Sequence, residues 1–139
     1  MLLLDTHVWI WAVEGDARRL GRRARGLISK AESQGAIRVS PVTLFEIVAL
    51  HTVGRIRLTH TPEHWIREAL TISGVRIAEL TPAVALEAGS IQRSALNDPL
   101  DRLLVATARL SDAALLTCDT RILAYASASG EVKVRDASR

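Results

Sequence analysis

Two aspartates follow apolar runs that are typical of buried strands. Asp5 comes directly after the apolar residues 2–4, and Asp119 comes two residues after a second apolar run that ends at Thr117. In an open parallel sheet, ligands bind beyond the carboxyl ends of the strands. We therefore expect the carboxylates of Asp5 and Asp119 to lie at the same edge of a sheet.

Two further acids belong to helices that touch this edge. Glu46 falls in the second turn of the helix expected after a strand at 37–40, and Asp101 opens the helix that leads to the strand ending at Thr117. Glu46 stands alone in the apolar run 42–50, and a helix that is apolar almost all round is expected to be buried. A buried carboxylate is costly unless it is paired or bound to a metal ion, so a partner arginine is the alternative for Glu46.

Clustered carboxylates repel one another, and without compensation at least one of them takes up a proton. A hard dication such as Mg²⁺ or Mn²⁺ removes this problem because it prefers oxygen ligands. Such an ion lowers the pKa of a bound water and polarises a phosphoryl oxygen. The sequence therefore predicts a hydrolytic metal site in which the catalytic and metal-binding residues are Asp5, Glu46, Asp101 and Asp119.

The aspartates also have a purely structural explanation. Asp5 and Asp119 each precede a predicted helix, where aspartate is a common N-cap. Asp98 is a suitable N-cap before Pro99, and Asp101 in the first turn would complement the helix dipole. The four acids taken together are more specific than any one of them.

Short apolar runs alternate with helical patterns along the chain, which is typical of an α/β fold. The predicted strands are residues 1–4, 37–40, 75–78, 113–117 and 132–134. A capping residue followed by proline marks the start of helices at Ser40, Thr61, Thr81 and Asp98, and a last short helix is expected at 119–126. Five strands and about seven helices predict a three-layer α/β/α sandwich around a five-stranded, mostly parallel sheet, as one domain over residues 1–139.

The chain has 139 residues and a net charge of +3, which suits a polyanionic partner. An apolar stripe from Leu20 to Ala31 predicts a helix whose opposite face carries Arg18, Arg22 and Arg25. This face is explained either by simple solvation or by contacts with phosphates or a partner. The few aromatic residues disfavour a base-stacking platform, so any nucleic acid would be held mainly by its phosphates.

Other features limit the class of protein. The lone cysteine, Cys118, cannot form an internal disulfide, and the apolar N-terminal stretch is shorter than the roughly 20 residues that a membrane span requires. We therefore expect a cytoplasmic protein. His60 and His64 are four residues apart, but Pro62 between them argues against a shared helical face and a metal site there.

Four stretches of the sequence resemble PIN-domain proteins, above all the VapC toxins of bacterial toxin–antitoxin pairs. They are Leu-Leu-Leu-Asp-Thr-His at 2–7, Phe-Glu-Ile at 45–47, Asp-Pro-Leu-Asp-Arg-Leu-Leu-Val-Ala at 98–106 and Leu-Thr-Cys-Asp at 116–119. The resemblance implies an α/β/α sandwich and Mg²⁺- or Mn²⁺-dependent endoribonuclease activity, often on tRNA or other structured RNA. It also implies inhibition by a cognate VapB-type antitoxin and a homodimer.

The resemblance assigns the same four acids. Asp5, Glu46, Asp101 and Asp119 match the first to fourth metal-binding acids of the family, and Asp98 could assist Asp101. One departure concerns a lysine that many relatives carry four residues after the second acid. This chain has Leu50 there, so any contact made by that lysine is in doubt.

One alternative is a module of the same fold that binds RNA or a protein without cutting. The acidic residues argue against it, because a pure phosphate binder gains nothing from an acidic cleft.

Another alternative is a receiver domain of the response-regulator type, which is also α/β and has an acidic Mg²⁺ pocket. Its phosphoacceptor aspartate should follow the third strand, but Glu79 is the only acid near the run 75–78. Its lysine should follow the last strand, but Lys133 lies inside the terminal run.

Overall fold

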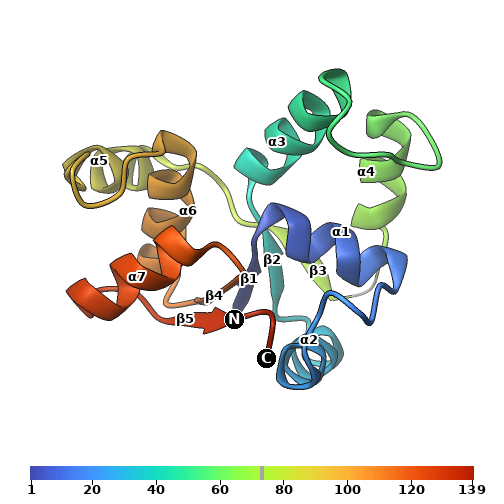
Figure 1. Cartoon of the computed structure of the whole chain (residues 1–139), viewed down its shortest axis with the longest axis horizontal. Helices are drawn as coiled ribbons and strands as arrows, with labels where there is room; N and C mark the ends of the chain where they lie inside the picture. The colour runs from blue at the N-terminus through green and yellow to red at the C-terminus, as the bar shows by residue number, and fades with distance from the viewer. Residues whose placement is uncertain (73) are drawn as a thin grey trace.

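The computed structural model of the chain describes residues 1–72 and 74–139. Five strands form one sheet in the order β3-β2-β1-β4-β5, and all four pairings are parallel (Figure 1). The strands are β1 (Leu2–Leu4), β2 (Ile37–Val39), β3 (Val75–Ile77), β4 (Ala114–Thr117) and β5 (Val134–Asp136). The predicted five-stranded α/β sandwich is therefore confirmed. A receiver domain is excluded, because folds of that type have the strand order 2-1-3-4-5.

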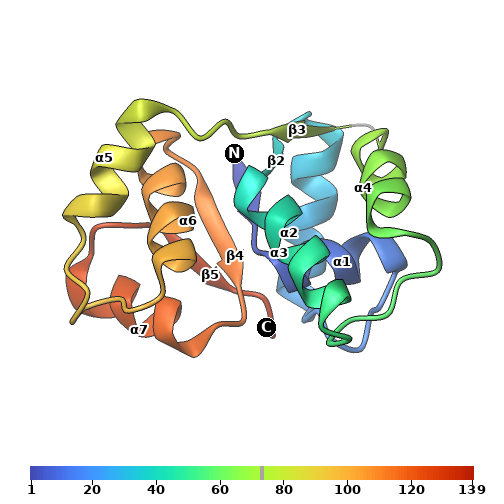
Figure 2. The same ribbon diagram turned by 90° about the horizontal axis from the view of Figure 1, so that it is seen from above.

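Seven helices in the described part of the chain surround the sheet. They are α1 (Thr6–Glu14), α2 (Arg22–Ser33), α3 (Pro41–Thr52), α4 (Pro62–Leu70), α5 (Pro82–Ser90), α6 (Pro99–Leu110) and α7 (Thr120–Ser129). The first four helices lie on one side of the molecule and the last three on the other (Figures 1 and 2). This arrangement follows from right-handed crossovers that run in opposite directions from the central strand β1.

The central strand contributes side chains to the two larger hydrophobic cores. Leu2 and Leu4 pack with α1 to α4 in one core, around Trp9, and Leu3 packs with α6 and α7 in the other core, around Leu104. Successive side chains of a strand point to opposite faces, so each core receives alternate leucines of β1. The N-terminal apolar run therefore forms a strand that is buried on both faces.

The capping signals are confirmed at four helices. Ser40, Thr61, Thr81 and Asp98 each accept a hydrogen bond from a backbone N–H of the first turn, and a proline follows each of them. Proline at this position has no N–H to lose and its fixed φ suits the helix. These caps fix where α3, α4, α5 and α6 begin.

Three details of the prediction are wrong. The helix α2 begins at Arg22, so Arg18 is not on its face, although Arg22 and Arg25 are exposed as expected. The last strand comprises Val134–Asp136 instead of 132–134. The helix α3 is not buried on all sides, because the side chain of Phe45 is 60% exposed.

The last residues of the chain pack against the start of α2. Gly21 donates a backbone hydrogen bond to Ala137, and Ala24 donates one to the carbonyl of Arg139 at 2.8 Å. A Cβ atom at Gly21 would overlap the backbone of Arg139. Gly21 itself provides no side-chain cap, so the carbonyl of Arg139 satisfies an N–H at the start of the helix instead.

None of the helices in residues 1–72 and 74–139 combines the length and hydropathy that a membrane crossing needs.

Candidate acidic active site

Asp5 and Asp119 are joined through one buried hydroxyl. Thr117, the last residue of β4, is fully buried and donates a 2.6 Å hydrogen bond to Oδ2 of Asp5 at the end of the neighbouring strand β1. The backbone N–H of Asp119 donates to the same hydroxyl at 2.9 Å. The two strand-end aspartates are therefore neighbours at the carboxyl edge of the sheet, as expected.

Glu46 reaches the same place from α3. The hydroxyl of Thr6 donates a 2.7 Å hydrogen bond to Oε1 of Glu46, and the backbone N–H of Thr6 donates to Oδ1 of Asp5 at 2.8 Å. Thr6 also lies 3.4 Å from the hydroxyl of Thr43, one turn before Glu46. The α1 and α3 helices thus hold Glu46 beside Asp5 through a threonine, and among residues 1–72 and 74–139 no arginine forms an ion pair with Glu46.

Asp101 completes the group from the first turn of α6. Its side chain is only 9% exposed, and burial followed by repulsion from Asp98, Asp119, Asp5 and Glu46 raises its pKa from 3.8 to about 7. Such repulsion requires the charges to lie near one another. The structure therefore brings the four predicted acids and Asp98 together, and we call these five residues the acidic cluster.

Two other members of the cluster have raised pKa values. Burial raises the pKa of Asp5, although the hydrogen bonds from Thr117 and Thr6 oppose this change. Burial also raises the pKa of Glu46, against the hydrogen bond from Thr6, and repulsion from Asp5 adds to the increase. The cluster thus holds more negative charge than its surroundings stabilise.

Three aspartates of the acidic cluster also cap helices, as the sequence analysis considered. Asp5, Asp98 and Asp119 are the N-caps of α1, α6 and α7, and each accepts a hydrogen bond from a backbone N–H of its helix. In Asp5, Oδ1 makes the cap while Oδ2 faces Thr117. Since a carboxylate has two oxygens with several lone pairs, capping leaves acceptors available for another ligand.

The donor set suits a hydrated Mg²⁺ or Mn²⁺ ion better than a preformed cage. Among residues 1–72 and 74–139, no three His, Cys, Asp or Glu side chains are arranged as ready ligands of one ion. Mg²⁺ keeps several of its waters and needs only one or two direct carboxylates. Every charged group that shifts the pKa of Asp101 is a carboxylate, so a cation would relieve the repulsion.

Sequence reasoning missed one residue of this site. The hydroxyl of Thr117 was not identified, although a lone hydroxyl at the end of an apolar strand beside Asp119 was a usable signal. The rings of His60 and His64 lie 4.6 Å apart, but α4 begins at Pro62, so His60 lies outside the helix and the two residues share no helical face, as expected. Leu50, at the position of the lysine that many relatives carry, is half-buried in α3.

The sequence of the chain is similar to a known family and to one of its ribonucleases. The PIN-domain model matches residues 2–128. Ribonuclease VapC22 of Mycobacterium tuberculosis is 32% identical over 124 residues, which cover 89% of this chain and 91% of that protein.

Two solved complexes have a chain with the same fold. A chain of VapBC2 from Rickettsia felis, bound to a DNA fragment from its promoter, has a TM-score of 0.69 at 13% identity, with 97% of each chain covered. A chain of DNA-bound VapBC from Salmonella typhimurium has a TM-score of 0.66 at 16% identity, with 97% of this chain and 96% of that one covered. The chain belongs to the PIN-domain family and is a VapC-type member of it.

Proposed function

We propose that the protein is a metal-dependent endoribonuclease and the toxin of a VapBC-type toxin–antitoxin pair. The observation that carries the proposal is the acidic cluster, in which burial and then repulsion between the carboxylates raise the pKa of Asp101 to about 7. The relation to Ribonuclease VapC22 supports RNA as the substrate. An acidic cleft without a cation would repel RNA, so the activity requires Mg²⁺ or Mn²⁺.

The residues of the cluster have distinct roles in this proposal. Asp5 and Asp101 are the principal metal ligands, and Glu46 and Asp119 complete the site or orient the attacking water. A bound divalent cation lowers the pKa of its water and polarises a phosphoryl oxygen. Thr117 and Thr6 fix the carboxylates of Asp5 and Glu46 by hydrogen bonds of 2.6 and 2.7 Å. Cleavage by water would leave 5′-phosphate and 3′-hydroxyl ends, on tRNA or another structured RNA in the cytoplasm.

An apolar groove between α3 and α4 suits a protein partner. It has a volume of about 690 Å³ and is lined by Leu44, Phe45, Val48, Ala49, Glu63, Ile66, Arg67 and Leu70. Exposed apolar patches of this kind commonly mark interaction sites. We assign the groove to the VapB-type antitoxin, and a homodimer is also expected for this family.

The enzymatic proposal is tested with Asp5→Asn and a matched control, Asp112→Asn. Asp112 is highly exposed, lies outside the acidic cluster and has a φ of 49°, which asparagine tolerates. We expect Asp5→Asn and excess EDTA each to abolish cleavage of RNA, and Asp112→Asn to cleave normally. Circular dichroism checks that both variants fold, and sequencing of the RNA ends identifies the chemistry.

Each result has a defined meaning. Equal cleavage by Asp5→Asn, or cleavage in excess EDTA, contradicts a metal-dependent mechanism. RNA binding that ignores metal, with no cleavage of any transcript, favours the binding-module alternative.

The partner proposal has a separate test. The antitoxin encoded beside this chain should copurify with it and suppress cleavage, and light scattering should give the mass of a dimer for the chain alone. Full activity in the presence of a tightly bound antitoxin contradicts the toxin assignment.

A further inference from the structure

We propose that the groove between the segment 91–97 and α7 is a subsite for the RNA strand next to the acidic cluster, with Arg121 bound to a backbone phosphate. The inference rests on the proposed function and names a place where this chain holds its substrate. The segment that joins α5 to α6 runs past α7 (Figure 2). The groove that they form has a volume of about 590 Å³.

The groove begins beside two of the acids. Asn97 lines it and immediately precedes Asp98. Arg121 also lines it, and its backbone N–H donates a 2.8 Å hydrogen bond to Oδ1 of Asp119. An RNA strand that has one phosphate at the acidic cluster can therefore continue directly into the groove.

Arg121 in the groove and Arg93, which is bonded to the lining residue Asn97, are available to bind phosphates. Among the described residues, the exposed side chains of Arg121 and Arg93 form no ion pair with an acid. Nε of Arg93 donates a 3.2 Å hydrogen bond to Oδ1 of Asn97, which orients the guanidinium at the rim. A metal ion at the acidic cluster would attract only the phosphates next to it. The phosphates farther along the RNA strand need another source of positive charge, and the nearby unpaired arginines supply it.

Small side chains leave room for a nucleotide. Ala95, Ala124 and Ala128 line the groove together with the apolar side chains of Leu96 and Tyr125. Single-stranded nucleic acid is bound by a positively charged groove that follows the backbone together with contacts to the bases, so the apolar wall can contact a sugar or base while Arg121 holds a phosphate.

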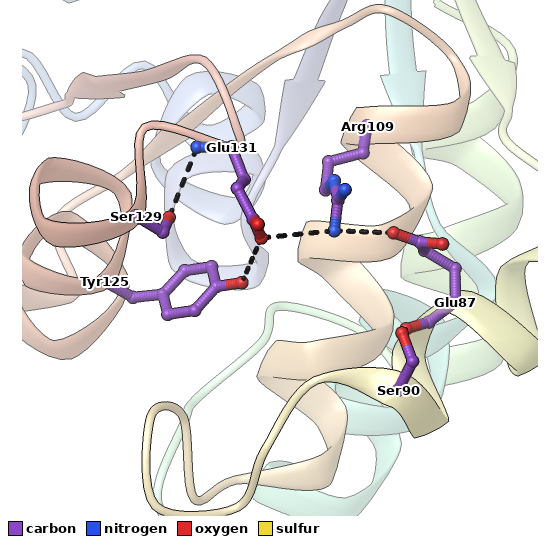
Figure 3. Close-up of polar contacts among 6 residues, drawn as sticks. All are labelled: Glu87, Ser90, Arg109, Tyr125, Ser129 and Glu131. Atoms are coloured by element: carbon purple, nitrogen blue, oxygen red, sulfur yellow. Dashed lines mark hydrogen bonds and ion pairs between the residues drawn. The ribbon is translucent and has the colours of Figure 1, made fainter.

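The end of the groove away from the acidic cluster is not suited to bind further phosphates. Arg109 is already paired with the carboxylates of Glu87 and Glu131, and the hydroxyl of Tyr125 donates to Glu131 at 3.2 Å (Figure 3). This group has two acids and one arginine, so it repels a backbone phosphate. The strand is therefore held only between the acidic cluster and Tyr125.

The arginines of α2 provide a matched control. Arg23 is exposed on α2, which packs in the core on the opposite face of the sheet from α7. Arg23→Gln removes the same charge as Arg121→Gln while leaving the groove intact. Arg121→Lys keeps the charge and tests whether a phosphate contact is sufficient.

The experiment measures binding of a fluorescein-labelled single-stranded oligoribonucleotide by anisotropy, over a range of salt, in the Asp5→Asn background. We expect Arg121→Gln to weaken binding by about fivefold to tenfold and to reduce the salt slope by about 0.7, the contribution of one phosphate on a single strand. Arg23→Gln should change neither, and Arg121→Lys should restore most of the affinity. With Asp5 intact, Arg121→Gln should raise KM for RNA by a similar factor.

Equal binding and equal KM for Arg121→Gln and Arg23→Gln overturn the subsite while leaving the nuclease untouched. Absence of both RNA cleavage by the intact protein and RNA binding by every variant overturns the proposed function, and the subsite with it.

Discussion

The hydroxyl of Thr117 is shared by two acids that lie far apart in the chain: it donates to Asp5 at 2.6 Å and accepts from the backbone of Asp119 at 2.9 Å. Thr117→Val keeps the shape of the side chain but removes both hydrogen bonds. We expect a loss of stability of about 1 to 2 kcal/mol, because the partly buried backbone N–H of Asp119 loses its partner. We also expect weaker Mn²⁺ binding, because Asp5 loses its orientation.

Urea denaturation and titration calorimetry with Mn²⁺ measure the two effects of Thr117→Val. Thr117→Ser retains the hydroxyl and should recover most of the Mn²⁺ affinity. Valine and serine variants with equal Mn²⁺ affinity would show that the hydroxyl does not orient Asp5.

Asp101 should give the folding stability of the metal-free protein an unusual pH dependence. Its pKa is about 7 in the folded protein and 3.8 as its ordinary value, so the folded state binds more protons between these limits. The contribution of this group to the free energy of unfolding is therefore greatest below about pH 4 and is lost as the pH rises toward 7. Asp101→Asn should remove this decline, and urea denaturation in EDTA from pH 4 to 8 measures it. Parallel curves for the two proteins would contradict the assignment.

Metal binding should release the proton that Asp101 holds. At pH 6 Asp101 is mostly protonated, and a cation requires the carboxylate, so binding of Mn²⁺ should release close to one proton from this residue. Above about pH 8 the release should vanish. Calorimetry in buffers of different ionisation enthalpy counts the protons, and a release that is independent of pH would exclude Asp101 as their source.

Two glycines of the same region should respond oppositely to alanine. Gly21→Ala places a Cβ against the backbone of Arg139, so we expect a loss of about 1 to 3 kcal/mol. Gly26, within α2, has open space around the corresponding position, so Gly26→Ala should add about 0.5 to 1 kcal/mol through helix propensity. Urea denaturation measures both changes, and equal effects would show that the chain end does not pack against α2.

Variants of Phe45 and Ile47 should distinguish the effect on antitoxin binding from the effect on folding stability. The side chain of Phe45 is 60% exposed, so Phe45→Ser should change stability by less than about 0.5 kcal/mol while weakening the antitoxin complex. Ile47 is fully buried, and Ile47→Ala should cost about 2 to 5 kcal/mol. Thermal denaturation and pull-down with the antitoxin measure the two properties. Unchanged antitoxin binding by Phe45→Ser would exclude this part of the groove.

The sequence predicts the central strands well because they are buried on both faces. Such strands are continuous apolar runs, as at residues 2–4 and 114–117. The last strand, Val134–Asp136, lies at the edge of the sheet beside β4 alone, and its residues are half-buried or exposed. Its weak apolar signal explains the displacement of the prediction by two residues.

The acids were identifiable because their positions at strand and helix ends place them at one edge of the sheet. The hydroxyl that joins Asp5 to Asp119 and the groove beside Arg121 depend on contacts between distant segments, which no local pattern contains. The exposed side of α3 was misread because apolar residues that bind a partner have the same composition as apolar residues of a core. Periodicity alone does not distinguish the two.

The position of β1 between two separate cores has a consequence for inactivation by heat. Glu46 depends on the helices packed around Trp9, whereas Asp101 and Asp119 depend on those packed around Leu104. Sub-global opening of either layer would separate the acids while the other layer stays folded. Catalysis would then fail at the temperature at which the less stable layer opens. A loss of RNA cleavage would therefore be measured at a lower temperature than the loss of the overall helical signal.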